Sequence, residues 1–310
     1  MFGMRILILG AGGIGGYFGA RLAAAGVDVT FLVRPARAER LARDGLVVTS
    51  PYGDVTQSVV AVTAAAGPFD AVLLSCKAYD LDSAIEAITP AVGPETLVLP
   101  LLNGVRHLDA LDAAFGKDRV LGGVALIGVT MTADGVIKHL NKLQGFVLGA
   151  RSPGQQERAA ALHAELEKGG FAPELSADVM QQMWEKFTML ATFAGVTCLM
   201  RAPIGAIMQA DDGETLVRAL FDECAKVSAA NGYDPREAFR AQSLGMLTAP
   251  GSPATASMLR DVESGGRTEH DHILGDLRDR GRAAGVAVPT LAIAYAHMQA
   301  YAARKAMESA

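Results

Sequence analysis

The first half of the chain alternates short apolar runs with helical patterns. Residues 5–9 form a run of isoleucine and leucine after an arginine, which is typical of a strand buried on both faces of a parallel sheet. The predicted elements are, in order, strand 5–9, helix 17–25, strand 27–33, strand 70–75, strand 96–99, two strands within 119–150 around Ala133-Asp134-Gly135, and a charged helix 155–168. This alternation predicts an α/β domain built on a parallel sheet.

Helical patterns dominate the second half, because strand signals cease from about residue 176 onward. Ser176 is placed to cap a long helix that runs through residues 184–187, and later helices are predicted at 213–231, 268–284 and 290–306. We therefore expect an α/β domain over residues 1–176 and an all-helical domain over residues 177–310. In such a plan the substrate binds between the two domains.

A glycine-rich turn follows the first predicted strand. Gly10, Ala11, Gly12, Gly13, Ile14 and Gly15 match the pattern GxGxxG, with a strand before them and a helix and second strand after them. Gly10 permits the tight turn, Gly12 lets the backbone approach a pyrophosphate, and Gly15 allows the helix to pack closely on the strand. The phosphates then meet free N–H groups at the helix N-terminus. These residues predict a Rossmann dinucleotide-binding domain.

The end of the second predicted strand discriminates between NAD and NADP. NAD-binding domains of this type carry an acidic residue there for the ribose 2′-hydroxyl. This chain instead has Arg34 and Arg37, and no carboxylate occurs before Glu39. The two guanidinium groups favour a 2′-phosphate, and therefore NADP, although they could also be solvated loop charges.

Composition narrows the class of partner. The 310 residues are 50% hydrophobic and carry a formal net charge of −5, so no basic field favours nucleic acid or an anionic membrane. No uncharged run reaches membrane-spanning length, and the glycines after Arg5 argue against a signal peptide. Three widely spaced cysteines argue against disulfides and metal. We expect a cytoplasmic protein that binds a small molecule, and leave a homodimer open.

Two polar residues follow the later strands of the predicted sheet. Lys77 comes directly after strand 70–75, and Asn103 follows strand 96–99. Ligands of open parallel sheets bind outside the carboxyl ends of the strands. Lys77 and Asn103 are therefore candidate site residues.

Motifs spread over nearly the whole chain give it a family resemblance. They are the glycine fingerprint, Cys76-Lys77-Ala78, Asn103-Gly104-Val105, Trp184-Glu185-Lys186-Phe187, Ser257-Met258-Leu259-Arg260-Asp261, Gly266-Arg267-Thr268-Glu269 and Gly285-Val286-Ala287-Val288-Pro289-Thr290. On these motifs the chain resembles the 2-dehydropantoate 2-reductase, or ketopantoate reductase, family. The resemblance implies an NADPH-dependent reductase of the pantothenate pathway, with a Rossmann domain followed by a helical domain.

The resemblance also implies roles for individual residues. Lys186 matches the catalytic lysine and Glu269 its partner glutamate, whereas Lys77, Asn103 and Ser257 match positions that contact cofactor or substrate. The chemistry agrees, because reduction of a 2-oxo acid places negative charge on the carbonyl oxygen, which an ammonium group stabilises and protonates. Taken alone, the residues leave open that Lys186 is a solvated helix charge, Glu269 an exposed acid and Ser257 a capping residue.

One departure from the family concerns the substrate. Pantoate-forming members usually carry asparagines one and two helical turns after the lysine, and this chain has Leu190 and Ala194 there. Spacings of four and eight keep both residues on the side of the helix that carries Lys186. A third polar position of the family is Ile204. Without these polar groups the site loses discrimination for a hydroxylated substrate, so we expect a close paralogue with a more apolar 2-oxo acid as readily as ketopantoate reductase itself.

Two other functions remain as alternatives. A hydroxyacid or hydroxyacyl dehydrogenase of the same architecture would normally use a catalytic histidine, but His107 and His139 lie in no such motif, and we expect His270 and His272 to flank Glu269 on a helix surface. A non-catalytic NADP-binding sensor is the second alternative. The presence of both Lys186 and Glu269 argues against it.

Overall fold

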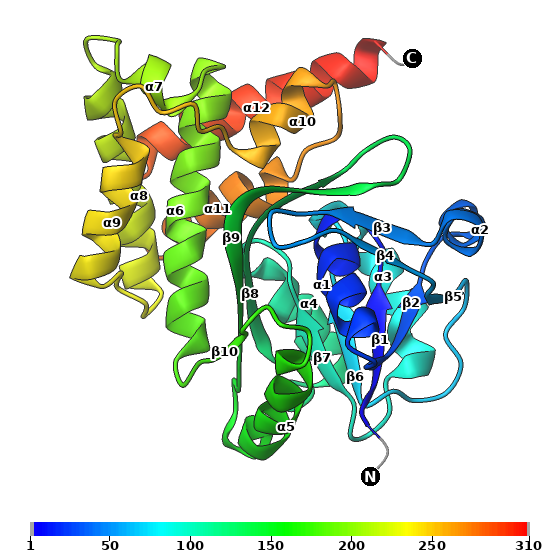
Figure 1. Ribbon diagram of the computed structural model, residues 1–310. Helices are drawn as coiled ribbons and strands as arrows, with labels where there is room; N and C mark the ends of the chain where they lie inside the picture. Colours follow the sequence, from blue (N-terminus) through cyan, green and yellow to red (C-terminus); the bar gives the residue numbers. More distant parts are fainter. Residues whose placement is uncertain (1–2, 309–310) are drawn as a thin grey trace. The chain divides into compact units, whose positions relative to one another are not determined.

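Two compact units make up the chain, Met1–Met180 and Gln181–Ala310, in the computed structural model, which describes residues 3–308 (Figure 1). Residues 1–2 of the first predicted domain and 309–310 of the second lie outside the described residues. The boundary expected after residue 176 and the boundary between the units both lie near the start of helix α6 (Val179–Met200). Of the helices within 3–308, none has the length and apolar character needed to cross a membrane.

A five-stranded parallel sheet forms the centre of the first unit. Its order is β5 (Val60–Val62), β2 (Asp28–Leu32), β1 (Arg5–Leu9), β6 (Ala71–Leu74) and β7 (Leu97–Pro100). Helices α1 (Gly13–Ala24), α2 (Pro35–Asp44), α3 (Leu81–Ile88) and α4 (Arg106–Phe115) connect or follow these strands. The order places β1 between β2 and β6, as in a doubly wound dinucleotide-binding domain, and confirms the predicted α/β fold.

Helix α1 packs between this sheet and a second one. A Cβ atom on Gly19 would lie 2.4 Å from the ring of Phe31 in β2, and one on Gly16 would lie 2.1 Å from Cδ1 of Ile137 in the second sheet. Both distances are too short for any side chain. The two glycines therefore let the helix approach both sheets, and Tyr17 and Phe18 are completely buried in the same core.

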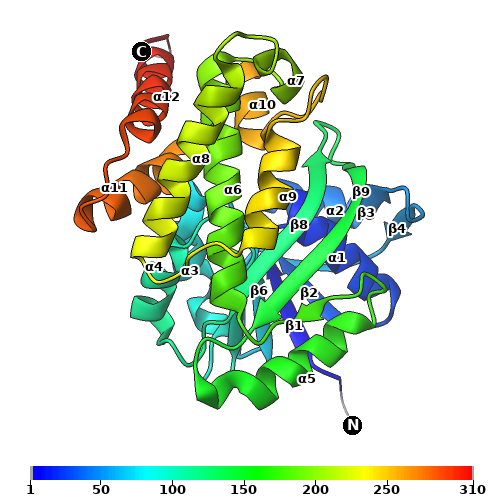
Figure 2. The same ribbon diagram turned by 90° about the vertical axis from the view of Figure 1, so that its left-hand side faces the viewer.

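The second sheet is built around a long β-hairpin, and Figure 2 shows the face of its two strands. Strands β8 (Gly122–Met131) and β9 (Ile137–Gly149) pair antiparallel, as the sequence predicts for residues 119–150. The other strands are β3 (Leu46–Thr49), β4 (Val55–Gln57) and β10 (Glu174–Leu175). Helix α5 (Gln156–Glu167) lies between β9 and β10 in the chain. Strands β3, β4 and β5 were not predicted, because each has only three or four residues.

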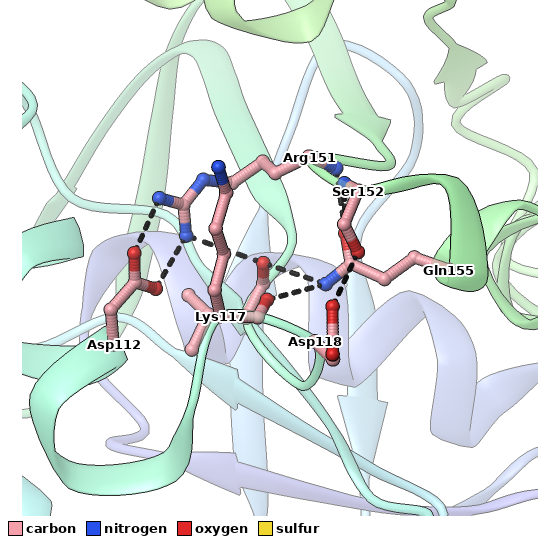
Figure 3. A network of polar contacts seen from close by, with 7 residues as sticks. Asp112, Lys117, Asp118, Arg151, Ser152 and Gln155 are labelled. Atoms are coloured by element: carbon pink, nitrogen blue, oxygen red, sulfur yellow. Dashed lines mark hydrogen bonds and ion pairs between the residues drawn. The ribbon is translucent and has the colours of Figure 1, made fainter.

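A polar network fixes the end of β9 to the segment after α4 (Figure 3). The guanidinium of Arg151 donates two hydrogen bonds of 2.7 Å to the carboxylate of Asp112. The side chain of Gln155 accepts from the amide of Arg151 at 2.6 Å and donates to the carbonyl groups of Lys117 and Val120, both at 2.9 Å. Because Gln155 is completely buried, these bonds satisfy its amide and hold α5 in place.

The second unit is helical, as predicted. Its elements are α6, α7 (Ile204–Ile207), α8 (Gly213–Ala230), α9 (Glu237–Leu247), α10 (Ser257–Glu263), the π-helical turn η4 (Asp271–Gly275), α11 (Asp276–Ala283) and α12 (Pro289–Glu308). Helices α6 and α8 cross closely, since a Cβ on Gly195 would lie 2.8 Å from Leu220. The helix that the sequence predicts over 268–284 begins as the π-helical turn. Ser176 lies before α6, where its hydroxyl accepts from the amide of Asp178 at 3.1 Å.

A buried carboxylate joins helices α6 and α9 of this unit. Glu185 in α6 accepts from the amide of Arg236 at 2.9 Å and from both ends of its guanidinium, at 2.8 and 2.5 Å. Burial alone would raise the pKa of Glu185, but the hydrogen bonds from Arg236 outweigh it and lower that pKa below its usual value. This ion pair anchors α6 to the start of α9.

Candidate active site

The glycine-rich turn has the geometry that its sequence predicts. Gly10 adopts a φ of 92°, which favours glycine, and its amide donates to the carbonyl of Leu32 at 2.9 Å. A Cβ on Gly15 would lie 2.2 Å from Oγ of Ser75, so only glycine permits this approach of α1 to β6. A Cβ on Gly12 would meet no atom within 4 Å among the described residues, which leaves the backbone there open to a ligand.

The N-terminus of α1 suits an anion. Gly12 is the N-cap, the described residues offer no side-chain cap, and the first turn contains no acidic residue. The first N–H groups of a helix lack partners within it, and the helix dipole adds partial positive charge there. Gly13 and Ile14 in this turn are only partly buried. The turn therefore fits the pyrophosphate of a dinucleotide.

Lys77 and Asn103 occupy the same edge of the parallel sheet as this turn. Lys77 is the N-cap of a 3₁₀ turn, η1 (Ala78–Asp80), directly after β6, and Asn103 lies in the bend after β7 beside Gly104, whose φ is 78°. Both side chains are partly buried. Because β1, β6 and β7 are neighbours and parallel, the sheet brings the loops that carry these residues together at its carboxyl edge.

The two arginines after β2 have different surroundings. The side chain of Arg34 is 81% exposed and forms an ion pair with Asp80 at 3.1 Å. Arg37 instead donates to the carbonyl oxygen of Ala11 at 2.8 and 3.2 Å and to that of Gly135 at 3.1 Å. Backbone carbonyls therefore already accept hydrogen bonds from Arg37, which leaves the exposed Arg34 as the more accessible guanidinium for a 2′-phosphate. Its contacts brace the glycine-rich turn against the hairpin tip.

Lys186 and Glu269 interact electrostatically within the second unit. Lys186 lies in α6, partly buried, and burial lowers the pKa of its ammonium from 10.5 to about 8 even though the nearby carboxylate of Glu269 raises it. Glu269 is buried and lies two residues before the start of the π-helical turn η4. A perturbed lysine beside a buried carboxylate is a common arrangement for proton transfer.

The side of α6 that carries Lys186 continues with apolar residues. Leu190 and Ala194 follow one and two turns later in the same uninterrupted helix, Leu190 partly exposed and Ala194 buried. Ile204 is completely buried at the start of α7, where its amide donates to the carbonyl of Ala254 at 3.0 Å. Ser257 is exposed at the first position of α10, and the N-cap of that helix is Ala256.

The histidines beside Glu269 are buried, so the expectation that they lie on a helix surface is wrong. His270 and His272 are each 8% exposed. Nδ1 of His270 lies 2.8 Å from Oγ1 of Thr268, and burial lowers the pKa of this histidine although nearby Asp271 raises it. His270 is the N-cap of the π-helical turn and His272 lies within it, a local geometry that the pattern of polar residues does not reveal.

Sequence reasoning also missed Asp80 and the contact that Arg37 makes with the glycine-rich turn. Asp80 pairs with Arg34 across 46 positions of the chain, and Arg37 binds Ala11 across 26. Neither contact has a local signal in the sequence. The order of the parallel strands, which places the segments after β2 and β6 on either side of β1, is the information that could have indicated them.

Comparisons with known proteins place both units of the chain in one family. The chain matches the family model "Ketopantoate reductase PanE/ApbA" over residues 6–153 and its C-terminal model over residues 178–302. It is 36% identical to the "Uncharacterized oxidoreductase YkpB" of Bacillus subtilis (strain 168), over 97% of this chain and 100% of that protein.

Solved structures show the same architecture. The crystal structure of 2-dehydropantoate 2-reductase from Geobacter metallireducens GS-15 has a TM-score of 0.87 and 30% identity, over 96% of this chain and 99% of that one. D-mandelate dehydrogenase with NADH and anilino(oxo)acetate has a TM-score of 0.88 at 21% identity, over 97% and 99%, a likeness of fold. The chain is thus an oxidoreductase of the type that acts on CH–OH donors, and it belongs to the ketopantoate reductase family.

Proposed function

We propose that the protein uses NADPH to reduce a 2-oxo acid to a 2-hydroxy acid, either 2-dehydropantoate to pantoate or, as we favour, a more apolar 2-oxo acid. The observation that carries the proposal is Lys186, a lysine with a pKa near 8 beside the buried carboxylate of Glu269. A cation of this kind is what the reduction of a carbonyl group requires.

The first unit supplies a suitable site for the cofactor. The open backbone at Gly12 and the uncapped N-terminus of α1 fit the pyrophosphate, and Lys77 and Asn103 would contact the nucleotide from the neighbouring loops. We infer NADPH from Arg34, whose exposed guanidinium follows β2 where NAD-binding domains carry an acid. NADPH, when bound, supplies the hydride.

The second unit supplies the proton. The ammonium of Lys186 donates a hydrogen bond to the carbonyl oxygen of the substrate, stabilises the negative charge that develops there, and transfers its proton to that oxygen. Because its pKa is about 8, the group is mostly protonated at neutral pH yet more acidic than an ordinary lysine. Glu269 stabilises the protonated form and positions it.

The residues beyond Lys186 support an apolar substrate tail. Leu190, Ala194 and Ile204 offer no side-chain donor or acceptor, whereas the hydroxyl of Ser257 can hydrogen-bond the carboxylate of a 2-oxo acid. Leaving a substrate hydroxyl without a partner against such residues costs about 1–3 kcal/mol, or roughly five- to a hundredfold in the specificity constant. An apolar tail gains from the same surroundings.

The three cysteines support a location in the reducing cytosol. Among the described residues, Cys76, Cys198 and Cys224 form no disulfide. Burial raises the pKa of Cys198 and Cys224 to about 12, so these two thiols are poor nucleophiles. None of the three needs an oxidising compartment for the fold we describe.

Oxidation of NADPH by the purified protein across a panel of 2-oxo acids tests the function. We expect turnover of 2-oxo acids with apolar tails, with a higher kcat/KM than for ketopantoate. A kcat/KM for ketopantoate above about 10⁴ M⁻¹s⁻¹, the highest of the panel, would contradict the apolar preference but not the reductase activity. Absence of NADPH oxidation with every 2-oxo acid would contradict the activity itself.

A further inference from the structure

An ion pair joins two loops at the carboxyl edge of the parallel sheet. Nη2 of Arg34 lies 3.1 Å from Oδ2 of Asp80, and the two side chains are 81% and 34% exposed. Arg34 is the N-cap of α2 and follows β2, whereas Asp80 ends η1 and is the N-cap of α3. Each residue therefore has a fixed backbone position at the start of a helix.

The pair lies on either side of the strand that leads into the glycine-rich turn. In the sheet, β1 is hydrogen-bonded to β2 on one side and to β6 on the other, all parallel. The segments after β2 and β6 consequently flank the turn at Gly10–Gly15. The amide of Asp80 donates to the carbonyl of Lys77 at 2.9 Å, which fixes the carboxylate in the loop that also carries Lys77.

The structure thus supplies a carboxylate where the sequence shows none. NAD-binding domains of this type place an acid after the second strand, and this chain has Arg34 there. Asp80 brings a carboxylate to the same arginine from a different loop. A carboxylate accepts a hydrogen bond from a ribose 2′-hydroxyl, and it also competes with a 2′-phosphate for the guanidinium.

We propose that Asp80 is a specificity-determining residue for the cofactor, one that narrows the preference of this chain for NADPH over NADH. This inference rests on the proposed function, since it concerns the same cofactor site. NADPH must replace the Asp80 carboxylate as the partner of Arg34 and place its 2′-phosphate near a like charge. NADH meets neither obstacle, and its 2′-hydroxyl can donate to that carboxylate.

Dissociation constants for NADPH and NADH, measured by titration calorimetry on the full chain, test the proposal. Asp80→Asn removes the charge and keeps the shape, and we expect it to tighten NADPH binding and to raise the ratio Kd(NADH)/Kd(NADPH) by about three- to tenfold, a range suited to an exposed pair. In an Arg34→Ala background, the same substitution should tighten NADPH binding by a smaller factor, because no guanidinium remains to be released and only the repulsion between Asp80 and the 2′-phosphate is relieved.

Asp82→Asn is the matched control. Asp82 is exposed in the first turn of α3, so its substitution makes the same change in net charge while the Arg34–Asp80 pair stays intact. We expect it to leave the ratio within about twofold of the unmodified protein. A shift as large as that of Asp80→Asn would overturn the proposal by showing a general charge effect.

The remaining outcomes separate this inference from the proposed function. If the unmodified protein binds both nucleotides and Asp80→Asn leaves the ratio unchanged or lowers it, Asp80 does not set specificity, although the reductase proposal stands. If neither nucleotide binds the unmodified protein, both proposals fail. A ratio that rises with Asp80→Asn and not with Asp82→Asn supports the specificity role.

Discussion

The N-terminal amide groups of helix α12 are capped by a side chain, whereas, among the described residues, those of helix α1 are not. At α12, Pro289 occupies the first position, and the buried carboxylate of Glu223 in α8 accepts hydrogen bonds from the amides of Thr290 and Leu291 at 3.0 and 2.9 Å. At α1, the N-cap is Gly12, and within residues 3–308 no side chain caps the helix. The same free amide groups are thus bound by the protein in one unit and left open in the other.

This contrast indicates which helix terminus serves stability and which serves binding. A buried carboxylate that accepts two amide hydrogen bonds stabilises the packing of α12 on α8. The uncapped start of α1 lacks such stabilisation, and the backbone at Gly12 is open to a ligand. The comparison therefore makes separate predictions for stability and for cofactor binding.

Placing a carboxylate at the N-terminus of α1 should have the largest effect. Gly12 has extended backbone angles, φ −87° and ψ −158°, and open space at its Cβ position, so Gly12→Asp fits and can cap the helix. We expect the Kd for NADPH to rise about a hundredfold or more, through repulsion of the phosphates, without a decrease in the free energy of unfolding. Gly12→Asn, which has the same shape, separates the effect of charge from that of size. Equal Kd values for the Asp and Asn variants would show that charge at this terminus does not matter.

Removing the carboxylate that caps α12 should have the opposite effect: it should decrease stability and leave NADPH binding unchanged. Glu223→Ala leaves the partly buried amide of Thr290 and the buried amide of Leu291 without their acceptor, so we expect the free energy of unfolding to fall by about 1–3 kcal/mol. The Kd for NADPH should remain within about twofold, because the first unit is unchanged. Denaturant unfolding followed by circular dichroism measures the first quantity and calorimetry the second. A Glu223→Ala variant with unchanged stability and weakened NADPH binding would contradict the proposal that the α12 terminus serves stability and the α1 terminus serves binding.

The pH dependence of kcat/KM tests whether Lys186, in the second unit, is the general acid. Because the pKa of Lys186 is lowered to about 8 and the ammonium is the required form, activity should be full below that pH. It should fall about tenfold for each pH unit above it. With an ordinary lysine, kcat/KM would not decrease until about pH 10. A profile that is flat between pH 7 and 10, with hydride transfer shown to limit the rate, would exclude Lys186 as the acid.

The smallest expected effect concerns substrate choice. Leu190→Asn combined with Ala194→Asn introduces amides on the side of α6 that carries Lys186, and should raise activity on ketopantoate about fivefold relative to an apolar 2-oxo acid. Competition between the two substrates at equal concentration measures this ratio directly. The variant Leu190→Met, which retains the apolar character, is the control. An unchanged ratio in the double variant would show that the substrate tail contacts other residues.

Local patterns in the sequence predict some parts of this molecule and not others. The fingerprint Gly10–Gly15 predicts β1, α1 and β2 together, because the positive φ of Gly10 and the close approach at Gly15 are local steric demands that the structure confirms. The roles of Lys186 and Glu269 come from the family resemblance, since the two residues are distant in sequence and no periodicity joins them. The Arg34–Asp80 pair, the carbonyl contacts of Arg37 and the burial of His270 depend on tertiary packing, which no window of residues encodes.

The turnover of Lys186→Ala tests the central claim most directly. NADPH oxidation in the presence of the best 2-oxo acid of the panel should fall about a hundredfold or more, which is the usual scale for a lost general acid or oxyanion partner. The Kd for NADPH should stay within about twofold, because that site is built by the first unit. Near-normal turnover by Lys186→Ala, with the cofactor bound as in the unmodified protein, would contradict the account.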